Sequence, residues 1–350
     1  MNSNLFLPAE WSPQDAVMLA WPHADTDWCD MLDEVVACYQ QIARAILQAE
    51  PLVVVTPDVD GAKRDLEEIE KTAPHRVHYF FVPTNDTWAR DFGAITVLRD
   101  GVCVPLDFKF DAWGMKFAAD KDNLVTSRLD RYGLFQNTPQ NLRHFVLEGG
   151  SIESDGNGTL MTTATCLLSP NRNATYTKDE ITECLKSMFG VRQVLWVHHG
   201  EMPGDDTDSH IDTLARFAPG NVILYNGAVC PCGDISEAHS RQLLDMEEEI
   251  NQMVNAHGEK YNLMQLPIPA PIYDEAGQPL PATYANFLIT NRSVLVPTYG
   301  QPLADELALG IIRVAFPEHE VQGIDCRALI KQHGSLHCIT MQFPKHTLHL

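Results

Sequence analysis

Five residues of chemically active types stand in otherwise apolar, strand-like surroundings: Asp91, Glu148, His210, Asp212 and Cys338. A cysteine thiolate is the strongest nucleophile among protein side chains, and an imidazole moves protons near neutral pH. Two carboxylates fit the planar fork of donors on a guanidinium cation. Because resonance stabilises the carbon of that cation, it reacts only with a strong nucleophile. The set therefore predicts hydrolytic attack on a guanidinium compound.

Each of the five residues has a role in such a reaction. Cys338 is the predicted nucleophile, and Asp91 and Asp212 are predicted to grip the guanidinium. His210 is the predicted general acid and base, because ammonia must leave protonated and a water must later lose a proton. We expect Glu148 to hold the imidazole of His210 and to favour its protonated form.

The spacing of these residues is close to regular. About sixty residues separate Asp91 from Glu148, and about sixty separate Glu148 from His210. The interval from Asp212 to Cys338 is about twice as long, as if one module were skipped. Equivalent positions in modules of a cyclic fold would meet near its axis, which would bring distant residues into one pocket.

Helical and extended patterns alternate along the chain. Apolar periodicity predicts helices over residues 33–47, 236–258 and 303–316. A capping-box pattern at Thr177 and Glu180, followed by Gly190, predicts a further helix. Short apolar or β-branched runs predict strands, among them 52–57, 77–82, 94–98, 159–163, 194–197 and 337–342. Since no linker or break in composition is visible, we expect one α/β domain over residues 1–350.

Charge and cysteine content narrow the class of function. The chain has 350 residues and a formal charge of −22. Nucleic-acid binding needs a basic face, so no nucleic-acid partner is expected, whereas an acidic field attracts a small cation. Nine scattered cysteines without a visible leader peptide are typical of reduced thiols in the cytoplasm. No apolar run of about 20 residues is present, so no membrane span is expected.

Several motifs, taken in order, resemble the agmatine deiminase family. They are Leu-Pro-Ala-Glu-Trp at 7–11, Asn-Asp-Thr-Trp-Ala-Arg-Asp-Phe-Gly at 85–93, Leu-Glu-Gly-Gly at 147–150, Asp-Ser-His-Ile-Asp at 208–212 and Leu-His-Cys-Ile-Thr at 336–340. The resemblance runs from about residue 7 to residue 343. It implies the guanidine-modifying, or pentein, superfamily: an α/β fold forming a five-fold pseudo-symmetric propeller of repeated ββαβ modules.

The resemblance also implies an activity and further site residues. The family hydrolyses agmatine to N-carbamoylputrescine and ammonia through a covalent thiouronium intermediate, here on Cys338, with no metal or organic cofactor. Its catalytic and guanidinium-binding roles fall on the same five residues. It adds Trp88 beside the guanidinium and Asp206 four residues before His210. The implied partner is a small cationic guanidinium substrate, and a homodimer is a further expectation.

Three places depart from the usual pattern of the family. Residues 332–338 read Gln-His-Gly-Ser-Leu-His-Cys where Gly-Gly-Gly-Asn-Ile-His-Cys is common. Ser209 stands where a glycine usually precedes the histidine, and Met115 follows a Trp-Gly pair where another glycine is common. These changes are expected at the pocket and its mouth, so they concern substrate preference rather than reaction type.

His337 immediately precedes the predicted nucleophile, which raises the question of a Cys–His pair. Neighbouring side chains of an extended strand point to opposite faces. We therefore expect His337 to point away from the thiol of Cys338.

Other functions remain open. Peptidyl-arginine or free arginine is the alternative substrate for the same chemistry, and bacterial-type peptidyl-arginine deiminases are the relatives that act on other substrates. Free arginine carries a carboxylate, for which Arg172 or Arg216 is the candidate partner. From other classes come a zinc hydrolase built on His210, Asp212 and Cys338, and a non-catalytic binding propeller.

Overall fold

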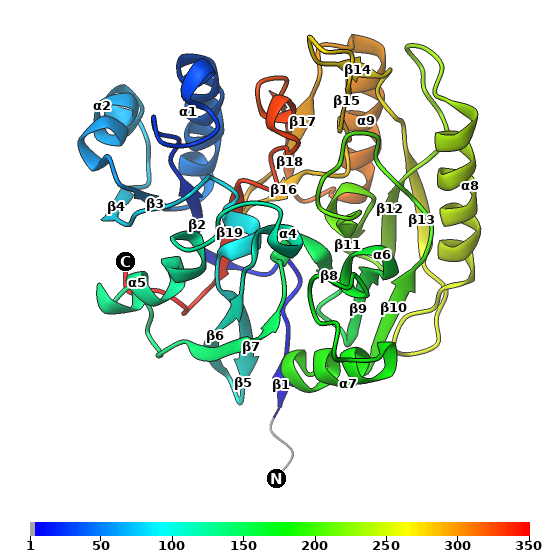
Figure 1. The fold of residues 1–350 in the computed structure, drawn as a ribbon, viewed down its shortest axis with the longest axis horizontal. Helices are drawn as coiled ribbons and strands as arrows, with labels where there is room; N and C mark the ends of the chain where they lie inside the picture. The colour runs from blue at the N-terminus through cyan, green and yellow to red at the C-terminus, as the bar shows by residue number, and fades with distance from the viewer. Residues whose placement is uncertain (1–3) are drawn as a thin grey trace.

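The computed structural model describes residues 4–350, in which helices and strands alternate from end to end (Figure 1). The expectation of a mixed α/β chain is thereby confirmed. Within these residues, no helix combines the length and the apolar character that crossing a membrane requires.

One strand arrangement recurs in five sheets of the described chain: an antiparallel pair, followed by a strand parallel to its second member. In hydrogen-bonded order the sheets are β19 (Thr340–Pro344), β2 (Gln14–Ala20), β3 (Leu52–Thr56), β4 (Val77–Phe81); β1 (Leu5–Phe6), β5 (Ile95–Arg99), β6 (Val102–Lys109), β7 (Gln140–Val146); β8 (Ile152–Ser154), β9 (Thr159–Thr163), β10 (Gln193–Val197); β11 (Ala215–Ala218), β12 (Val222–Asn226), β13 (Asn262–Leu266); and β16 (Leu288–Ile289), β17 (Ser293–Thr298), β18 (Glu320–Asp325). A separate hairpin joins β14 (Ile272–Tyr273) to β15 (Pro279–Leu280).

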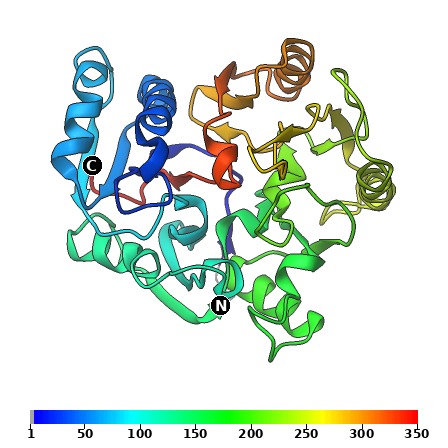
Figure 2. The same ribbon diagram turned by 45° about the horizontal axis from the view of Figure 1, so that its top comes forward.

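Helices provide the crossovers that parallel strands require. They are α1 (Leu32–Ala49) and α2 (Val59–Glu70) in the first sheet, then α5 (Val125–Arg131), α7 (Lys178–Phe189), α8 (Glu237–Gln252) and α9 (Pro302–Ala315), one for each remaining sheet. Figure 2 shows these helices on the outer side of the molecule, with the sheets between them and its middle. The first sheet also joins the two ends of the chain, since β19 pairs with β2.

Local sequence explains where the helices begin and end. Helix α7 has the expected capping box between Thr177 and Glu180, and it ends at Gly190 with φ of 68°. A left-handed residue at this position favours glycine. Helix α9 begins at Pro302, whose fixed φ suits the first helical position.

Two predicted boundaries are wrong. Helix α8 ends at Gln252 instead of continuing to Gly258. Its last buried residue is Ile250, and Gly258 instead takes part in a turn, with φ of 82°. The last strand begins at Thr340 and not at His337, because Thr340 donates its backbone N–H to the carbonyl of His337 and closes a turn.

Candidate active site

The predicted site residues lie just before the strand that begins the recurring three-strand arrangement in each sheet. Asp91 is in the short helix α3 (Ala89–Phe92) before β5, and Glu148 precedes the turn η3 (Gly149–Ser151) before β8. Asp212 is in the turn η4 (Ile211–Thr213) before β11, and Cys338 is in the turn before β19. The turns η3 and η4 contact each other, and α3 contacts both η3 and β19. The near-regular spacing therefore reflects equivalent places in repeated sheets.

Asn286 occupies this place before β16, in the sheet that the predicted spacing skipped. It is fully buried, and its Oδ1 accepts hydrogen bonds from the backbone N–H of His337 at 2.9 Å and of Cys338 at 3.3 Å. The thiol of Cys338 lies 3.4 Å from the same oxygen. Sequence reasoning missed Asn286, although the doubled interval before Cys338 was a signal of its position.

Cys338 lies at the wall of a cavity of about 470 Å³. Seven aspartates line this cavity, namely Asp25, Asp27, Asp86, Asp91, Asp122, Asp205 and Asp206. Its aromatic lining consists of Trp88, Phe110, Trp113 and Phe117, and Lys121 and His333 are its basic residues. An acidic cavity with aromatic walls suits a cationic ligand with an apolar chain.

The Cys338 side chain is protonated in the resting structure. Burial, together with the nearby charges of Asp212 and Asp91, raises the pKa of its thiol well above the usual range. A cation between the two aspartates would offset this effect, so the arrangement favours thiolate formation only once a cationic substrate has bound.

The two predicted guanidinium ligands differ in their surroundings. Asp91 accepts from the backbone N–H of Gly150 and from Nε1 of Trp113, both at 2.9 Å. Its pKa is nevertheless raised well above the usual range by burial, with Asp212 adding to the effect. Asp212 accepts through Oδ2 from His337 at 2.7 Å. Burial raises its pKa, but this bond and the charge of His337, with smaller contributions from His210 and Arg216, together lower it. Among described residues, Oδ1 of Asp212 has no hydrogen-bond partner, which leaves it free for a ligand.

His210 is neutral in this structure. Burial, with Arg172 acting in the same direction, lowers its pKa to about 3, although Asp212 opposes the change. Its Nδ1 lies 3.7 Å from Oδ1 of Asp91, and no described residue forms a hydrogen bond to its Nε2. A neutral imidazole with a free nitrogen can accept a proton from a thiol.

Gly150 permits this close grouping. A Cβ at this position would lie 2.7 Å from Nδ1 of His210, 2.9 Å from Oδ1 of Asp91 and 3.0 Å from Oδ2 of Asp212. The three groups therefore converge on one backbone position that only glycine fits.

Glu148 does not hold the imidazole in the way we expected. Both of its carboxylate oxygens accept from Nε of Arg172, at 2.8 and 3.1 Å. Arg172 also donates to Asp208 at 2.6 Å and to the carbonyl of Thr207 at 2.8 Å. Glu148 thus fixes Arg172 and the loop that leads to His210, and one of its oxygens lies within 4.8 Å of a ring nitrogen of His210.

A possible cation-binding group lies beside the site. Glu148, Cys166 and His210 bring one ligand atom each within 4.8 Å of one another. The guanidinium of Arg172 already binds both oxygens of Glu148, so this carboxylate is committed to an internal cation. The group also differs from the predicted zinc set, which combined His210 with Asp212 and Cys338.

The two arginines considered for a substrate carboxylate are both committed elsewhere. Arg172 binds Glu148 and Asp208, as described above, and its side chain is buried. Arg216 is fully buried and forms ion pairs with Glu10 at 2.6 Å and Glu153 at 3.1 Å. Neither lines the cavity.

Trp88 and Asp206, which the family resemblance added to the site, both line the cavity, and their binding roles stay a prediction. Trp88 is nearly buried and donates through Nε1 to Asp86 at 3.1 Å. Burial and the neighbouring Asp205 raise the pKa of Asp206 to about 6. Lys116 donates to the backbone carbonyl of Asp206 at 2.5 Å, so it does not occupy the carboxylate of Asp206, which lines the cavity.

Of the departures from the family pattern, Gln332 and His333 line this cavity, whereas Ser335, Ser209 and Met115 are not among its lining residues. His333, which lines it, contacts the carbonyl of Gly204 through Nδ1 at 2.8 Å, and Ser335 contacts the hydroxyl of Tyr299 at 3.1 Å. Ser209 adopts φ of 64°, a left-handed conformation that favours glycine. Met115 is 68% exposed.

Comparisons with known proteins agree with this geometry. Residues 6–344 match the model of a family described as Porphyromonas-type peptidyl-arginine deiminase. The chain is 35% identical over 366 residues to a Shewanella baltica protein named "Putative agmatine deiminase", covering 98% of this chain and 95% of that protein. A Porphyromonas gingivalis crystal structure described as a "Putative Arginine Deiminase" is 48% identical, with a TM-score of 0.89 and coverage of 99% and 100%. A C. jejuni agmatine deiminase with substrate bound is 37% identical, with a TM-score of 0.89 and coverage of 98% and 97%.

Proposed function

The chain belongs to the Porphyromonas-type peptidyl-arginine deiminase family, and from this premise we propose that it is an agmatine deiminase with Cys338 as its nucleophile. The observation that carries the proposal is that Cys338 and Asp91 both line an acidic cavity, while the charge of the buried Asp212 also acts on the thiol. Membership of this family confirms the resemblance seen in the sequence and implies a hydrolase that acts on C–N bonds.

The proposed reaction begins when the guanidinium binds between Asp91 and Asp212. Its charge lowers the cost of ionising Cys338, and His210 takes the thiol proton. The sulfur then attacks the guanidinium carbon. As the C–N bond breaks, His210 returns the proton to the departing nitrogen, which leaves as ammonia. The product on the protein is a thiouronium at Cys338.

Water completes the reaction. His210, now neutral again, takes a proton from a water that attacks the thiouronium carbon. The tetrahedral intermediate loses its hydroxyl proton to solvent as it collapses to a carbonyl, which breaks the C–S bond and releases Cys338 as a thiolate. N-carbamoylputrescine leaves, and the proton on His210 is available to reprotonate the sulfur. No metal or organic cofactor takes part in this proposal.

The cavity supports agmatine as the substrate. Agmatine has a cation at each end, and the cavity offers aspartates beyond those that face the reacting carbon. We propose that Asp206 binds the primary ammonium. Free arginine would place its carboxylate among these acids, and the candidate partners Arg172 and Arg216 are paired internally.

Peptidyl-arginine is the second candidate. The family description and the basic Lys121 at the cavity wall favour it, because an amide-linked arginine has a neutral tail. A peptide also needs an open entrance, whereas agmatine fits within the cavity.

An ammonia-release assay tests these assignments. Purified protein is incubated with agmatine, free arginine and an arginine-containing peptide, each with and without EDTA. We expect turnover of agmatine at the highest kcat/KM, unchanged by the chelator. A higher kcat/KM for the peptide overturns the substrate assignment and leaves the cysteine chemistry standing. Loss of activity in EDTA that zinc restores overturns the cofactor-free mechanism.

The fold completes the proposal. We propose that the five sheets are the ββαβ modules of a five-fold pseudo-symmetric α/β propeller, forming one catalytic domain over residues 1–350. The recurring strand order and the apolar core that extends from Leu7 to Leu348 support this description. We also propose a cytoplasmic location and leave the homodimer as an expectation.

A further inference from the structure

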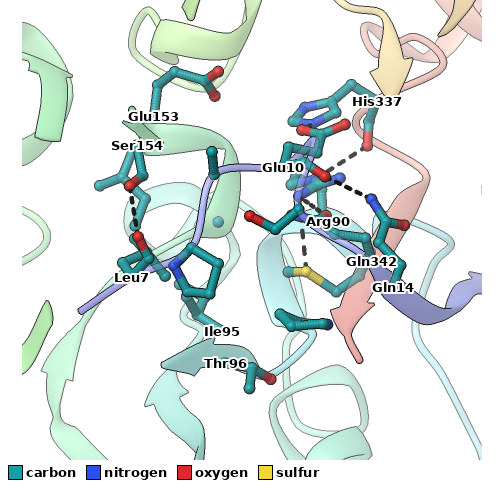
Figure 3. A pocket seen from close by; sticks show the side chains of 17 residues that line it. Leu7, Glu10, Gln14, Arg90, Ile95, Thr96, Glu153, Ser154, His337 and Gln342 are labelled. Carbon is teal, nitrogen blue, oxygen red and sulfur yellow. Dashed lines mark hydrogen bonds and ion pairs between the residues drawn. The ribbon is translucent and has the colours of Figure 1, made fainter. Parts of the chain in front are cut away.

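His337 is buried between two carboxylates and lines a small cavity separate from the substrate cavity. Its Nδ1 lies 2.7 Å from Oδ2 of Asp212, and its Nε2 lies 2.9 Å from Oε2 of Glu10. The ring is 1% exposed. Figure 3 shows this imidazole beside the carboxylate of Glu10, which lies close to the guanidinium of Arg90.

The partners determine the protonation of the ring. An ionised carboxylate only accepts hydrogen bonds, so two carboxylates require a proton on each nitrogen of the imidazole. Glu10 accepts at both carboxylate oxygens, from the backbone N–H of Ile289 at 2.7 Å and from Arg216 at 2.6 Å, as an ionised carboxyl group does. The pKa of Asp212 is lowered despite burial. Burial raises the pKa of Glu10, and the charges of Arg216 and then of His337 lower it. For Asp212 the bond to His337 is the largest influence that lowers the pKa.

The charges around the ring balance when it is positive. Glu10, Glu153 and Asp212 are its acidic neighbours. Burial raises the pKa of Glu153, but its carboxylate oxygens pair with Arg216 at 3.1 Å and accept from the N–H of Phe217 at 3.1 Å, which favours the charged form. Arg90 and Arg216 are the cationic ones. Three negative charges against two positive ones leave a deficit of one positive charge, which an imidazolium supplies. Unpaired buried charge is strongly disfavoured, so this balance stabilises the charged ring.

We infer that His337 is a positioning residue that remains an imidazolium and holds Asp212 ionised, with Oδ1 turned toward the substrate. This inference rests on the proposed function for its kinetic consequence. The backbone supports the same role, because Asn286 fixes the N–H of His337 while the side chain fixes Asp212. His337 therefore acts on the guanidinium through Asp212 and not through the thiol.

A small cavity behind the ring makes the role accessible to chemical rescue. This rear cavity, of about 60 Å³, is lined by His337, Glu10, Arg90, Gln14 and Thr96, among others (Figure 3). Half-buried residues, including Pro8 and Gln342, also line it. Removal of the imidazole would join this space to the void left behind, which gives room for free imidazole.

Two isosteric variants separate the two contacts of the ring. In His337→Asn the amide nitrogen replaces Nδ1, so the bond to Asp212 is kept without the charge. In His337→Gln the amide nitrogen replaces Nε2, so the bond to Glu10 is kept and that to Asp212 is lost. His78→Asn on β4, outside both cavities, is the matched control.

The kinetic test is the pH profile of kcat/KM for whichever guanidinium compound the wild type hydrolyses. Asp212 must be ionised to bind the cation, and its pKa rises when the imidazolium is lost. We expect the acid limb of His337→Asn to move up by about one pH unit. For His337→Gln we expect kcat/KM to fall about ten- to a hundredfold, mainly because KM rises. For a third variant, His337→Gly, we expect added imidazole to restore part of the lost activity. Acid limbs that match the wild type in both substituted proteins overturn the inference.

A second measurement needs neither activity nor a variant that folds well. Nitrogen NMR of wild-type protein labelled with ¹⁵N-histidine reports the protonation of each ring. We expect both nitrogens of His337 to carry protons at pH 7 to 8, and a deprotonated nitrogen overturns the inference. If the wild type hydrolyses no guanidinium compound, the proposed function fails, while the charge of His337 is still decided by this spectrum.

Discussion

At the scale of single residues, burial favours the uncharged forms of the two reacting side chains, Cys338 and His210, in the absence of substrate. The thiol of Cys338 holds its proton because a thiolate would face Asp212 and Asp91, and His210 stays neutral for want of solvation. The nucleophile is therefore generated by the substrate's own charge. This coupling protects a buried thiol from neutral electrophiles and reserves its reactivity for cations.

Cationic and neutral alkylating reagents should distinguish Cys338 from an ordinary thiol. We expect chloroacetamidine, whose amidinium resembles a guanidinium, to inactivate the protein at pH 7 at least about a hundredfold faster than iodoacetamide. The iodoacetamide rate should climb as pH rises, because the thiolate forms only at high pH in the empty site. Residual activity against time measures both rates, and equal rates would show that the aspartates do not control the thiol.

Replacement of the nucleophile tests the covalent step. We expect Cys338→Ser to abolish turnover while the thermal midpoint stays close to that of the wild type, because a hydroxyl has similar volume and far weaker nucleophilicity. The wild type is allowed to react with a slow substrate and the reaction is quenched. Mass spectrometry should then find the adduct on the peptide that contains Cys338. Cys232→Ser, at an exposed thiol, is the control. An adduct on another cysteine would reassign the nucleophile.

Asp206 should bind the primary ammonium of agmatine, the second cation of the substrate. A charge-assisted hydrogen bond contributes about 1.5–3 kcal/mol, so Asp206→Asn should lower kcat/KM for agmatine about ten- to a hundredfold. A neutral-tailed alkylguanidine should lose little. Because the pKa of Asp206 is raised to about 6, the preference of the wild type for agmatine should weaken as pH falls through that value. Glu201→Gln, on the exposed surface of the same loop, is the control, and equal losses for both substrates would exclude Asp206 as the ammonium ligand.

At the scale of secondary-structure elements, the site residues are held by short turns that precede the sheets and not by long helices. The turns around Asp91, Glu148 and Asp212 pack against one another with Gly150 among them. Because its φ is not left-handed, Gly150 is required by space and not by backbone strain. A methyl group there should push the reacting groups apart without unfolding the protein.

Gly150→Ala therefore separates activity from stability. We expect kcat/KM to fall at least about a hundredfold, since misplacement of reacting groups by about 1 Å has effects of that size. The thermal midpoint should fall by only a few degrees. The matched control is Gly310→Ala in α9, where a Cβ meets nothing within 4 Å and alanine favours the helix. Near-normal activity of the Gly150→Ala protein would contradict the crowding described here.

Sequence patterns predicted the elements better than the turns. Apolar periodicity found α1 and α9 to within two residues, because one face of each helix is buried. The pairing of Glu148 with Arg172 was missed, since an ion pair between loops leaves no periodic trace. The strand rule placed His337 away from the thiol, yet the residue lies in a turn and contacts Asp212 and Glu10. Asn286 was signalled only by a gap in the spacing.

The net charge governs substrate capture at the scale of the whole molecule. A formal charge of −22 and an acidic cavity attract a dication over distances comparable to the Debye length. That length falls from about 30 Å at 0.01 M salt to about 3 Å at 1 M. Screening should therefore weaken binding of agmatine more than that of a monocation.

Salt dependence measures this attraction. We expect kcat/KM for agmatine to fall about three- to tenfold between 0.01 and 0.5 M sodium chloride, and that for an alkylguanidine to fall less. The same series with sucrose at matched viscosity separates screening from slower diffusion. Identical salt slopes for the two substrates would show that the second charge is not sensed.

The pairing of β19 with β2 has a consequence for the order in which the protein becomes active during synthesis. The ribosome makes Asp91, Glu148, His210 and Asp212 first, and Cys338 enters the chain only just before β19. Until that strand is available, the first sheet lacks one edge and the site lacks its nucleophile. A nascent chain therefore cannot modify any guanidinium group, including the arginines of its own unfolded segments. The step that closes the fold is also the step that completes the site.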